Sequence, residues 1–126
     1  MENVVKIKFY PEGEILGMSG PWAGKVEINQ YLLEGEFLDQ PFIFNESKEY
    51  LLLVKYEKAK MLKDVKFIMI LVNCYNLNTY KYIQPFDKLY IESFYDSSIV
   101  YFNSFNNENQ SKKSVIKFND IDFIKE

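Results

Sequence analysis

The residues of this chain with the most obvious chemical potential are carboxylates, because the sequence contains no histidine and no arginine. Glu34, Glu36 and Asp39 place three carboxylates within six residues. Two carboxylates can hydrolyse a glycosidic bond, and a larger set can hold calcium. Calcium needs six or more oxygen ligands, however, and the EF-hand spacing is absent. A solvated turn is the favoured interpretation of these acids, and part of an acidic binding patch is the next, so we predict no metal ion and no bound cofactor.

The sequence contains no histidine, the residue that most often activates a catalytic nucleophile. A serine or cysteine nucleophile needs a neighbouring base, which is most often histidine. The only cysteine, Cys74, follows an apolar run and is expected to be a small buried residue rather than a nucleophile. We therefore predict that the protein is not an enzyme and acts by binding.

Residues 19–26 (SGPWAGKV) resemble a phosphate-binding loop only superficially. That motif needs glycine where Ser19 stands and serine or threonine where Val26 stands. The residues that follow alternate as in a strand, whereas a phosphate-binding loop opens a helix. The sequence therefore favours a turn shaped by glycine and proline over a nucleotide site.

Trp22 is the only tryptophan and lies within the Gly17–Gly24 stretch, the largest predicted break in the chain. The favoured prediction is that Trp22 folds back and plugs the core. The alternative is an exposed binding anchor, since tryptophan is enriched among the residues that dominate interface energies.

Acidic residues are unevenly distributed along the chain. Between Phe9 and Glu57, nine acidic residues face three lysines, although the whole chain carries a net charge of only −3. An ordinary solvated surface would account for this run, but an acidic patch would attract a basic protein partner, and not nucleic acid. The residues that we predict to contact such a partner are Trp22, Glu34, Glu36, Asp39, Glu46 and Glu49.

The dominant hydrophobic period is two, which is typical of β-strands. Apolar residues alternate with lysine from Val5 to Phe9, where Pro11 and Gly13 are expected to end the strand. A second alternating run extends from Lys25 through Leu33. Similar patterns predict strands around residues 89–91, 99–102 and 115–118.

Two further runs, Tyr50–Tyr56 and Phe67–Val72, are almost continuously apolar. Strands that are covered on both faces have this composition, so we expect these two to be central. Residues 55–64 between them are compatible with one short helix or with a lysine-rich hairpin loop.

About eight short strands separated by turn residues predict an all-β (or β-rich α+β) fold. We expect residues 1–126 to form a single domain, built as an antiparallel sandwich or a strongly bent sheet. Met1–Asn3 shows no start of a signal peptide, and no apolar run is long enough to cross a membrane as a helix. These features favour the cytoplasm.

Three features together resemble a known family: the opening Val4–Ile28, the acid-rich Glu34–Glu49 stretch and the Asn-rich segment Asn103–Ser111. They are similar to those of the immunity proteins of bacterial polymorphic toxin systems, including contact-dependent growth inhibition. The resemblance implies an inhibitor that binds a cognate, basic toxin domain, often a nuclease, and occludes its cationic active site.

Two alternatives remain open at this point. The many tyrosines, among them Tyr75, Tyr80, Tyr82 and Tyr95, would suit a small β-module that stacks a sugar or another small ligand. More simply, these tyrosines are the half-buried residues of a sheet. A subunit that assembles with other proteins and binds no ligand is the second alternative.

Overall fold

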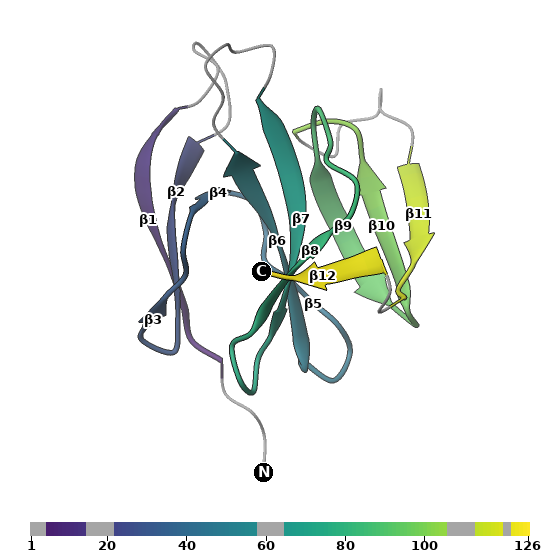
Figure 1. Cartoon of the computed structure of the whole chain (residues 1–126), viewed down its shortest axis with the longest axis horizontal. Helices are drawn as coiled ribbons and strands as arrows, with labels where there is room; N and C mark the ends of the chain where they lie inside the picture. Colours follow the sequence, from purple (N-terminus) through teal and green to yellow (C-terminus); the bar gives the residue numbers. More distant parts are fainter. Residues whose placement is uncertain (1–4, 15–21, 58–64, 106–112, 120–121) are drawn as a thin grey trace.

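The computed structural model describes residues 5–14, 22–57, 65–105, 113–119 and 122–126. These residues form β-strands joined by turns and contain no α-helix, which confirms the predicted all-β class (Figure 1). The strands are β1 (Ile7–Glu14), β2 (Trp22–Ile28), β3 (Tyr31–Leu32), β4 (Glu36–Leu38), β5 (Ile43–Phe44), β6 (Tyr50–Glu57), β7 (Lys66–Asn73), β8 (Thr79–Tyr82), β9 (Tyr90–Tyr95), β10 (Ser98–Phe102), β11 (Lys113–Lys117) and β12 (Phe123–Lys125).

Every strand pairing in the described residues is antiparallel, and the strands form two sheets. The large sheet has nine strands in the order β1-β2-β4-β6-β7-β8-β12, with β3 beside β2 and β5 beside β6. The small sheet has the order β11-β10-β9. Figure 1 shows β1–β4 to one side of the β6–β7 pair and the small sheet to the other.

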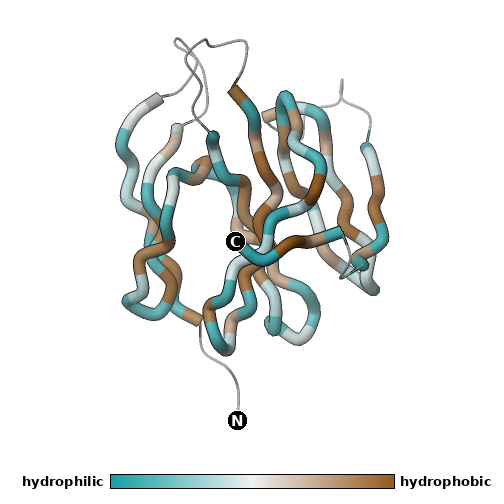
Figure 2. Tube along the Cα trace, viewed as in Figure 1, coloured by the Kyte–Doolittle hydropathy of each residue, from teal (hydrophilic) through white to brown (hydrophobic). Residues whose placement is uncertain are grey.

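The β6–β7 pair has a buried core on each of its faces. Along β6, Leu51 and Leu53 belong to one core, whereas Leu52 and Val54 belong to the other. The first core lies under β1, β2 and β4, and the second lies under the small sheet. Because successive side chains of a strand point to opposite faces, a strand covered on both sides must be apolar at every position. The prediction that these two runs are central is confirmed (Figure 2).

The described residues contain twelve strands, more than the eight expected from the sequence. Four of them, β3, β4, β5 and β12, have only two or three residues. An alternating pattern cannot be recognised over so short a distance.

The first strand does not end at Pro11, contrary to the prediction. β1 continues to Glu14, and its register against β2 shifts between Pro11 and Gly13. β1 lies at the edge of the large sheet, where a proline can be accommodated because one side of the strand needs no hydrogen-bonded partner.

The alternating run from Lys25 to Leu33 is interrupted, also contrary to the prediction. Asn29 and Gln30 both have positive φ angles, 50° and 71°, and they form the turn of the β2–β3 hairpin. Two positive φ values are typical of the tight type I′ turn of a two-residue hairpin. Because Ile28 lies opposite Tyr31, the turn shifts the alternation by one residue.

Residues 58–64, where a short helix was considered, lie outside the described residues, whereas Lys55–Glu57 are part of β6. Residues 106–111, most of the Asn-rich segment, also lie outside them. Among the described residues there is no helix of the length and apolar character that would cross a membrane.

Candidate binding surfaces

Trp22 is 48% exposed at the start of β2, so the favoured prediction of a core plug is wrong. The Trp22 carbonyl accepts a hydrogen bond from the Asp39 backbone N–H at 2.8 Å. The neighbouring Ala23 is buried, as expected from the alternation of a strand. Trp22 and the exposed Asp39 therefore lie together at one surface of the molecule.

Glu34 lies in a polar groove that also contains lysines. The groove has a volume of about 230 Å³, and Lys55, Lys125 and Glu126 are among its lining residues. Lys55 Nζ lies 2.9 Å from Glu126 Oε2. Two lysines and two carboxylates thus line the same groove, so Glu34 is not part of an unopposed acidic surface.

Lysine also reaches the turn between Glu34 and Glu36. Lys25 Nζ donates a hydrogen bond to the Gly35 carbonyl at 3.0 Å. Gly35 has φ +99°, and a Cβ atom there would lie 2.6 Å from Lys55 Cε. The turn therefore needs glycine for its backbone angle, whereas the end of the flexible Lys55 side chain could move away from a Cβ atom.

Glu46 and Glu49 lie at the opposite end of β6 from Glu36. Glu36 pairs with Tyr56, near one end of this strand, whereas Glu49 directly precedes Tyr50 at the other. At about 3.3 Å per residue, these two positions are about 20 Å apart along the strand. The acidic stretch is continuous in sequence but is divided in space, which corrects the expectation of one joined patch.

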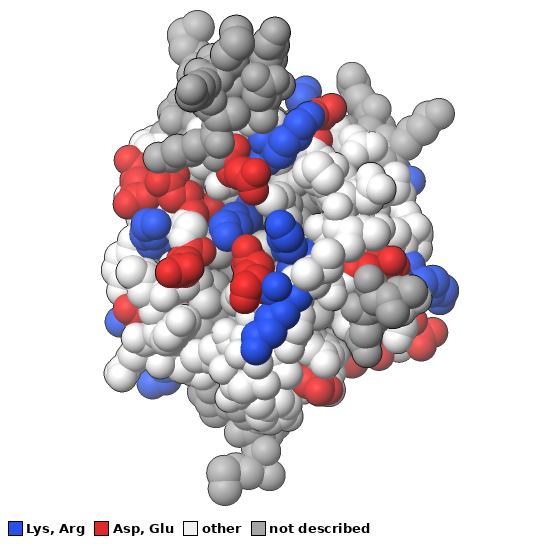
Figure 3. Space-filling model, in the orientation of Figure 1, with Lys and Arg blue, Asp and Glu red and all other residues white. Residues whose placement is uncertain are grey.

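Figure 3 shows one consequence of this arrangement. Acidic and basic side chains alternate over the centre of the face that it presents, and no extended surface of one sign covers that centre. The residues chosen from the sequence thus belong to three places: Trp22 with Asp39, Glu34 with Glu36, and Glu46 with Glu49.

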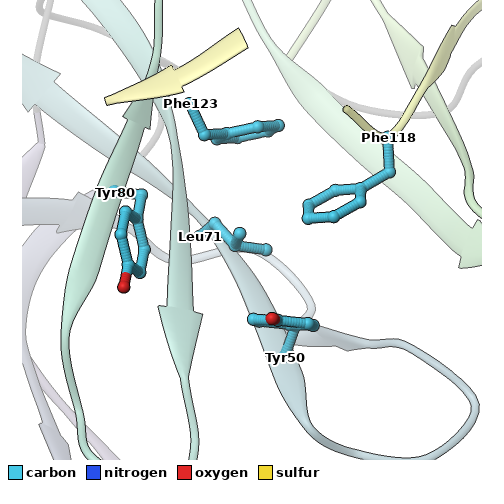
Figure 4. A pocket seen from close by; sticks show the side chains of 5 residues that line it. All are labelled: Tyr50, Leu71, Tyr80, Phe118 and Phe123. Atoms are coloured by element: carbon cyan, nitrogen blue, oxygen red, sulfur yellow. The ribbon is translucent and has the colours of Figure 1, made fainter. Parts of the chain in front are cut away.

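An aromatic cleft lies between the two sheets, close to Glu46. Its apolar part has a volume of about 260 Å³. Figure 4 shows the five side chains around it, which come from β6, β7, β8, β12 and the segment after β11. They are Tyr50, Leu71, Tyr80, Phe118 and Phe123.

Phe118 is the ring that connects the walls of this cleft. Its centroid lies 5.6 Å from Tyr50, 5.5 Å from Phe94 and 5.6 Å from Phe123. Its backbone N–H donates to the Ser97 carbonyl at 2.7 Å. Both the backbone and the ring of Phe118 are therefore held in place at the junction of the sheets.

A second, more polar cavity of about 310 Å³ adjoins the first and shares Tyr50 and Phe118 with it. Glu46 and Asp96 line this second cavity, and Glu46 Oε1 accepts a hydrogen bond from the Asp96 backbone N–H at 3.0 Å. Its other lining residues are Asn45, Ser47, Phe94 and Ser97. Within the described residues, no lysine lines either cavity.

Two turns hold the acidic side of the cleft. In the turn before β6, Asn45 Oδ1 accepts a hydrogen bond from the Tyr50 N–H at 3.0 Å. In the turn between β9 and β10, Asp96 and Ser97 have φ angles of 50° and 61°. These turns bring Glu46 and Asp96 together from positions far apart in the chain.

The other residues considered in the sequence analysis are Cys74, the tyrosines and the glycine-rich segment around Trp22. Cys74 is buried, and this burial raises the pKa of its thiol. Tyr82 packs against Phe123 at 5.3 Å, as expected of a half-buried sheet residue, whereas Tyr75 and Tyr95 are exposed. Gly24 and Lys25 lie within β2 and form no phosphate-binding loop. In the described ranges, no three side chains of the metal-binding types are grouped to hold a metal ion.

Sequence reasoning did not identify the cleft. Tyr50 was assigned only to a central strand and Phe118 to the strand predicted around residues 115–118, and no predicted site included Asp96. Nothing in their spacing links these residues, because they meet only when the small sheet packs on the large one.

No protein-family model, curated protein or solved structure matches this chain.

Proposed function

We propose that this chain is an immunity-type inhibitor that binds a cognate, basic bacterial toxin domain and occludes its active site. The observation that carries the proposal is the exposure of Trp22. An exposed tryptophan is costly to leave in water, and tryptophan is over-represented among the residues that dominate protein interfaces. Its neighbour Asp39 supplies a carboxylate that would complement a cationic surface.

The rest of the chain supports binding rather than catalysis. Its ionisable residues include no histidine, and its lysines and carboxylates pair on the surface, as in Lys55–Glu126. A nuclease has a cationic cleft for phosphate, and an inhibitor that presents carboxylates and aromatic rings would fill that cleft and exclude the substrate. A standard interface of this kind buries about 1,600 Å² in total.

The test is co-expression with the product of the adjacent reading frame. The proposal expects that product to be toxic alone, to be harmless together with this chain, and to co-purify with it. Trp22→Ala should speed dissociation at least about tenfold, because removal of a central anchor costs 2 kcal/mol or more. Tyr75→Ala, which removes an exposed ring in the turn after β7, serves as the matched control.

Two results would contradict the proposed function. If the adjacent product is toxic, and this chain neither protects the cell nor co-purifies with that product, then the proposed function is wrong. Protection by an inactive, non-binding variant would also contradict occlusion as the mechanism.

A further inference from the structure

We propose that the cleft between the sheets is a receptor for an arginine side chain of the protein partner. This inference rests on the proposed function and assigns one contact within it. The inference rests on two adjoining cavities, one lined by aromatic rings and one lined in part by two carboxylates. The two cavities share Tyr50 and Phe118.

The size of the cleft fits a side chain. Its two parts have volumes of about 260 and 310 Å³, one just below and one just above the lower limit of the roughly 300–1,000 Å³ that is usual for small-molecule sites. A cofactor would fill a larger and more enclosed volume, whereas one long side chain and an apolar neighbour from a partner would occupy these two spaces.

The chemistry of the walls favours a planar cation. The aromatic faces of Tyr50 and Phe118 attract a guanidinium group and cover its aliphatic stem. Glu46 and Asp96 stand on the polar side, where they accept the hydrogen bonds of the guanidinium fork. Glu46 already accepts one bond from the Asp96 N–H, but a carboxylate has about four acceptor positions and retains capacity for a ligand.

The charge balance of the cleft distinguishes it from the groove around Glu34. That groove contains Lys55 and Lys125, which would repel a cation. Three lysines are adjacent in sequence to cleft residues, Lys48, Lys81 and Lys117, and none of them is among the residues that line it. Lys117 Nζ instead donates to Ser98 Oγ at 3.1 Å. Among the described residues, the lining of the cleft therefore combines aromatic rings with two carboxylates and includes no lysine.

The first experiment uses the isolated chain and small probes. N-acetyl-arginine methylamide should produce saturable shifts in the amide NMR signals of residues 45–50, 94–98 and 118, with a dissociation constant in the millimolar range, about −4 kcal/mol. The citrulline analogue has almost the same shape without the charge and should bind at least about tenfold more weakly. Equal binding of the two probes, no saturable shift, or preferential binding of a methyl glucoside would overturn the inference.

The variants preserve the fold by design. Glu46→Gln keeps an oxygen that can accept the Asp96 N–H, and Asp96→Asn suits a positive φ angle. The double variant should bind the arginine probe at least about tenfold more weakly, while Glu92→Gln, whose carboxylate pairs with Lys113 outside the cleft, should bind it unchanged.

The second experiment separates this inference from the proposed function. In the complex with the adjacent gene product, the double variant should lose about tenfold or more in affinity. If the complex forms and ignores both substitutions, the arginine contact is wrong and the inhibitor function stands. If no complex forms but the isolated chain binds arginine as described, the inhibitor function fails and the cleft is a cation site for another partner.

Discussion

The rings of Tyr50 and Phe118 pack with their centroids 5.6 Å apart, and this contact joins the two sheets. Tyr50 begins β6 of the large sheet, and Phe118 directly follows β11 of the small sheet. Phe118 also contacts Phe94 and Phe123, so one ring touches β6, β9 and β12. Sheet packing and the shape of the cleft thus depend on the same residue.

Replacement of Phe118 should therefore lower the stability of the whole chain. We expect Phe118→Ala to reduce the free energy of unfolding by about 2–4 kcal/mol, somewhat less than the loss at a fully buried phenylalanine. The measurement is the urea midpoint together with its slope. Tyr95→Ala, at a ring that is 68% exposed, should change stability by less than about 0.5 kcal/mol. Equal effects of the two variants would show that Phe118 does not connect the sheets.

Gly24 and Gly13 lie close together in the β1–β2 pair but should tolerate alanine very differently. A Cβ atom at Gly24 would overlap the Tyr10 carbonyl group and lie 2.9 Å from Pro11 Cα, whereas nothing lies within 4 Å of a Cβ at Gly13. Gly24→Ala should destabilise the chain by about 2 kcal/mol or more, because backbone atoms must move apart. Gly13→Ala should stay within about 0.5 kcal/mol. Thermal unfolding followed by circular dichroism would measure both, and similar melting temperatures would contradict the close approach.

Trp22 should report its own exposure, because it is the only tryptophan. Its fluorescence in the native protein should be readily quenched by acrylamide, though less efficiently than in the urea-unfolded chain, because about half of the side chain is exposed. Trp22→Ala should reduce stability by about 1–3 kcal/mol, since only about half of the ring is removed from water, roughly 100 Å² at about 25 cal/mol/Å². Phe67→Ala, at a ring that is 1% exposed, should cost about 3–5 kcal/mol. Native fluorescence that resists quenching would place Trp22 back in the core.

Alkaline pH should destabilise the protein through Tyr82 and Cys74. The pKa of Tyr82 is raised by burial, and then by the nearby Asp122 and by Tyr101. Burial also raises the pKa of Cys74. When a folded-state pKa is raised, the unfolded chain loses its proton at lower pH, so stability is intact below the ordinary pKa of the group and falls above it.

The expected result is a urea midpoint that is constant near neutrality and declines above about pH 8.5 for the thiol and about pH 10 for the phenol. Tyr82→Phe should remove the phenol's part of this decline. In the native protein, Cys74 should also react with iodoacetamide far more slowly than in the unfolded chain, because the thiolate is the nucleophile. A flat profile to high pH would contradict the burial of these groups.

Periodicity identified much of the fold because it reflects which faces are covered. The continuous apolar runs at Tyr50–Tyr56 and Phe67–Val72 predicted two central strands, and β6 and β7 have a core on each face. The prediction of one alternating run overlooked the turn at Asn29–Gln30, where the apolar positions change from even numbers, Val26 and Ile28, to odd numbers, Tyr31 and Leu33. The pattern also could not show that a strand continues through Pro11. Proline is tolerated at this position because β1 lies at the edge of the sheet, and only the tertiary structure shows that position.

By itself, the sequence determined the strand-forming segments, the absence of histidine chemistry and the burial of Cys74. Only the tertiary structure decided that Trp22 is exposed, that lysines reach the turn at Glu34–Glu36, and that Glu46 meets Asp96 beside Tyr50 and Phe118. The physical reason is the distance along the chain over which each kind of signal acts. Alternation and composition report the local environment of a strand, whereas a surface or a cleft is assembled from residues that become neighbours only when sheets pack.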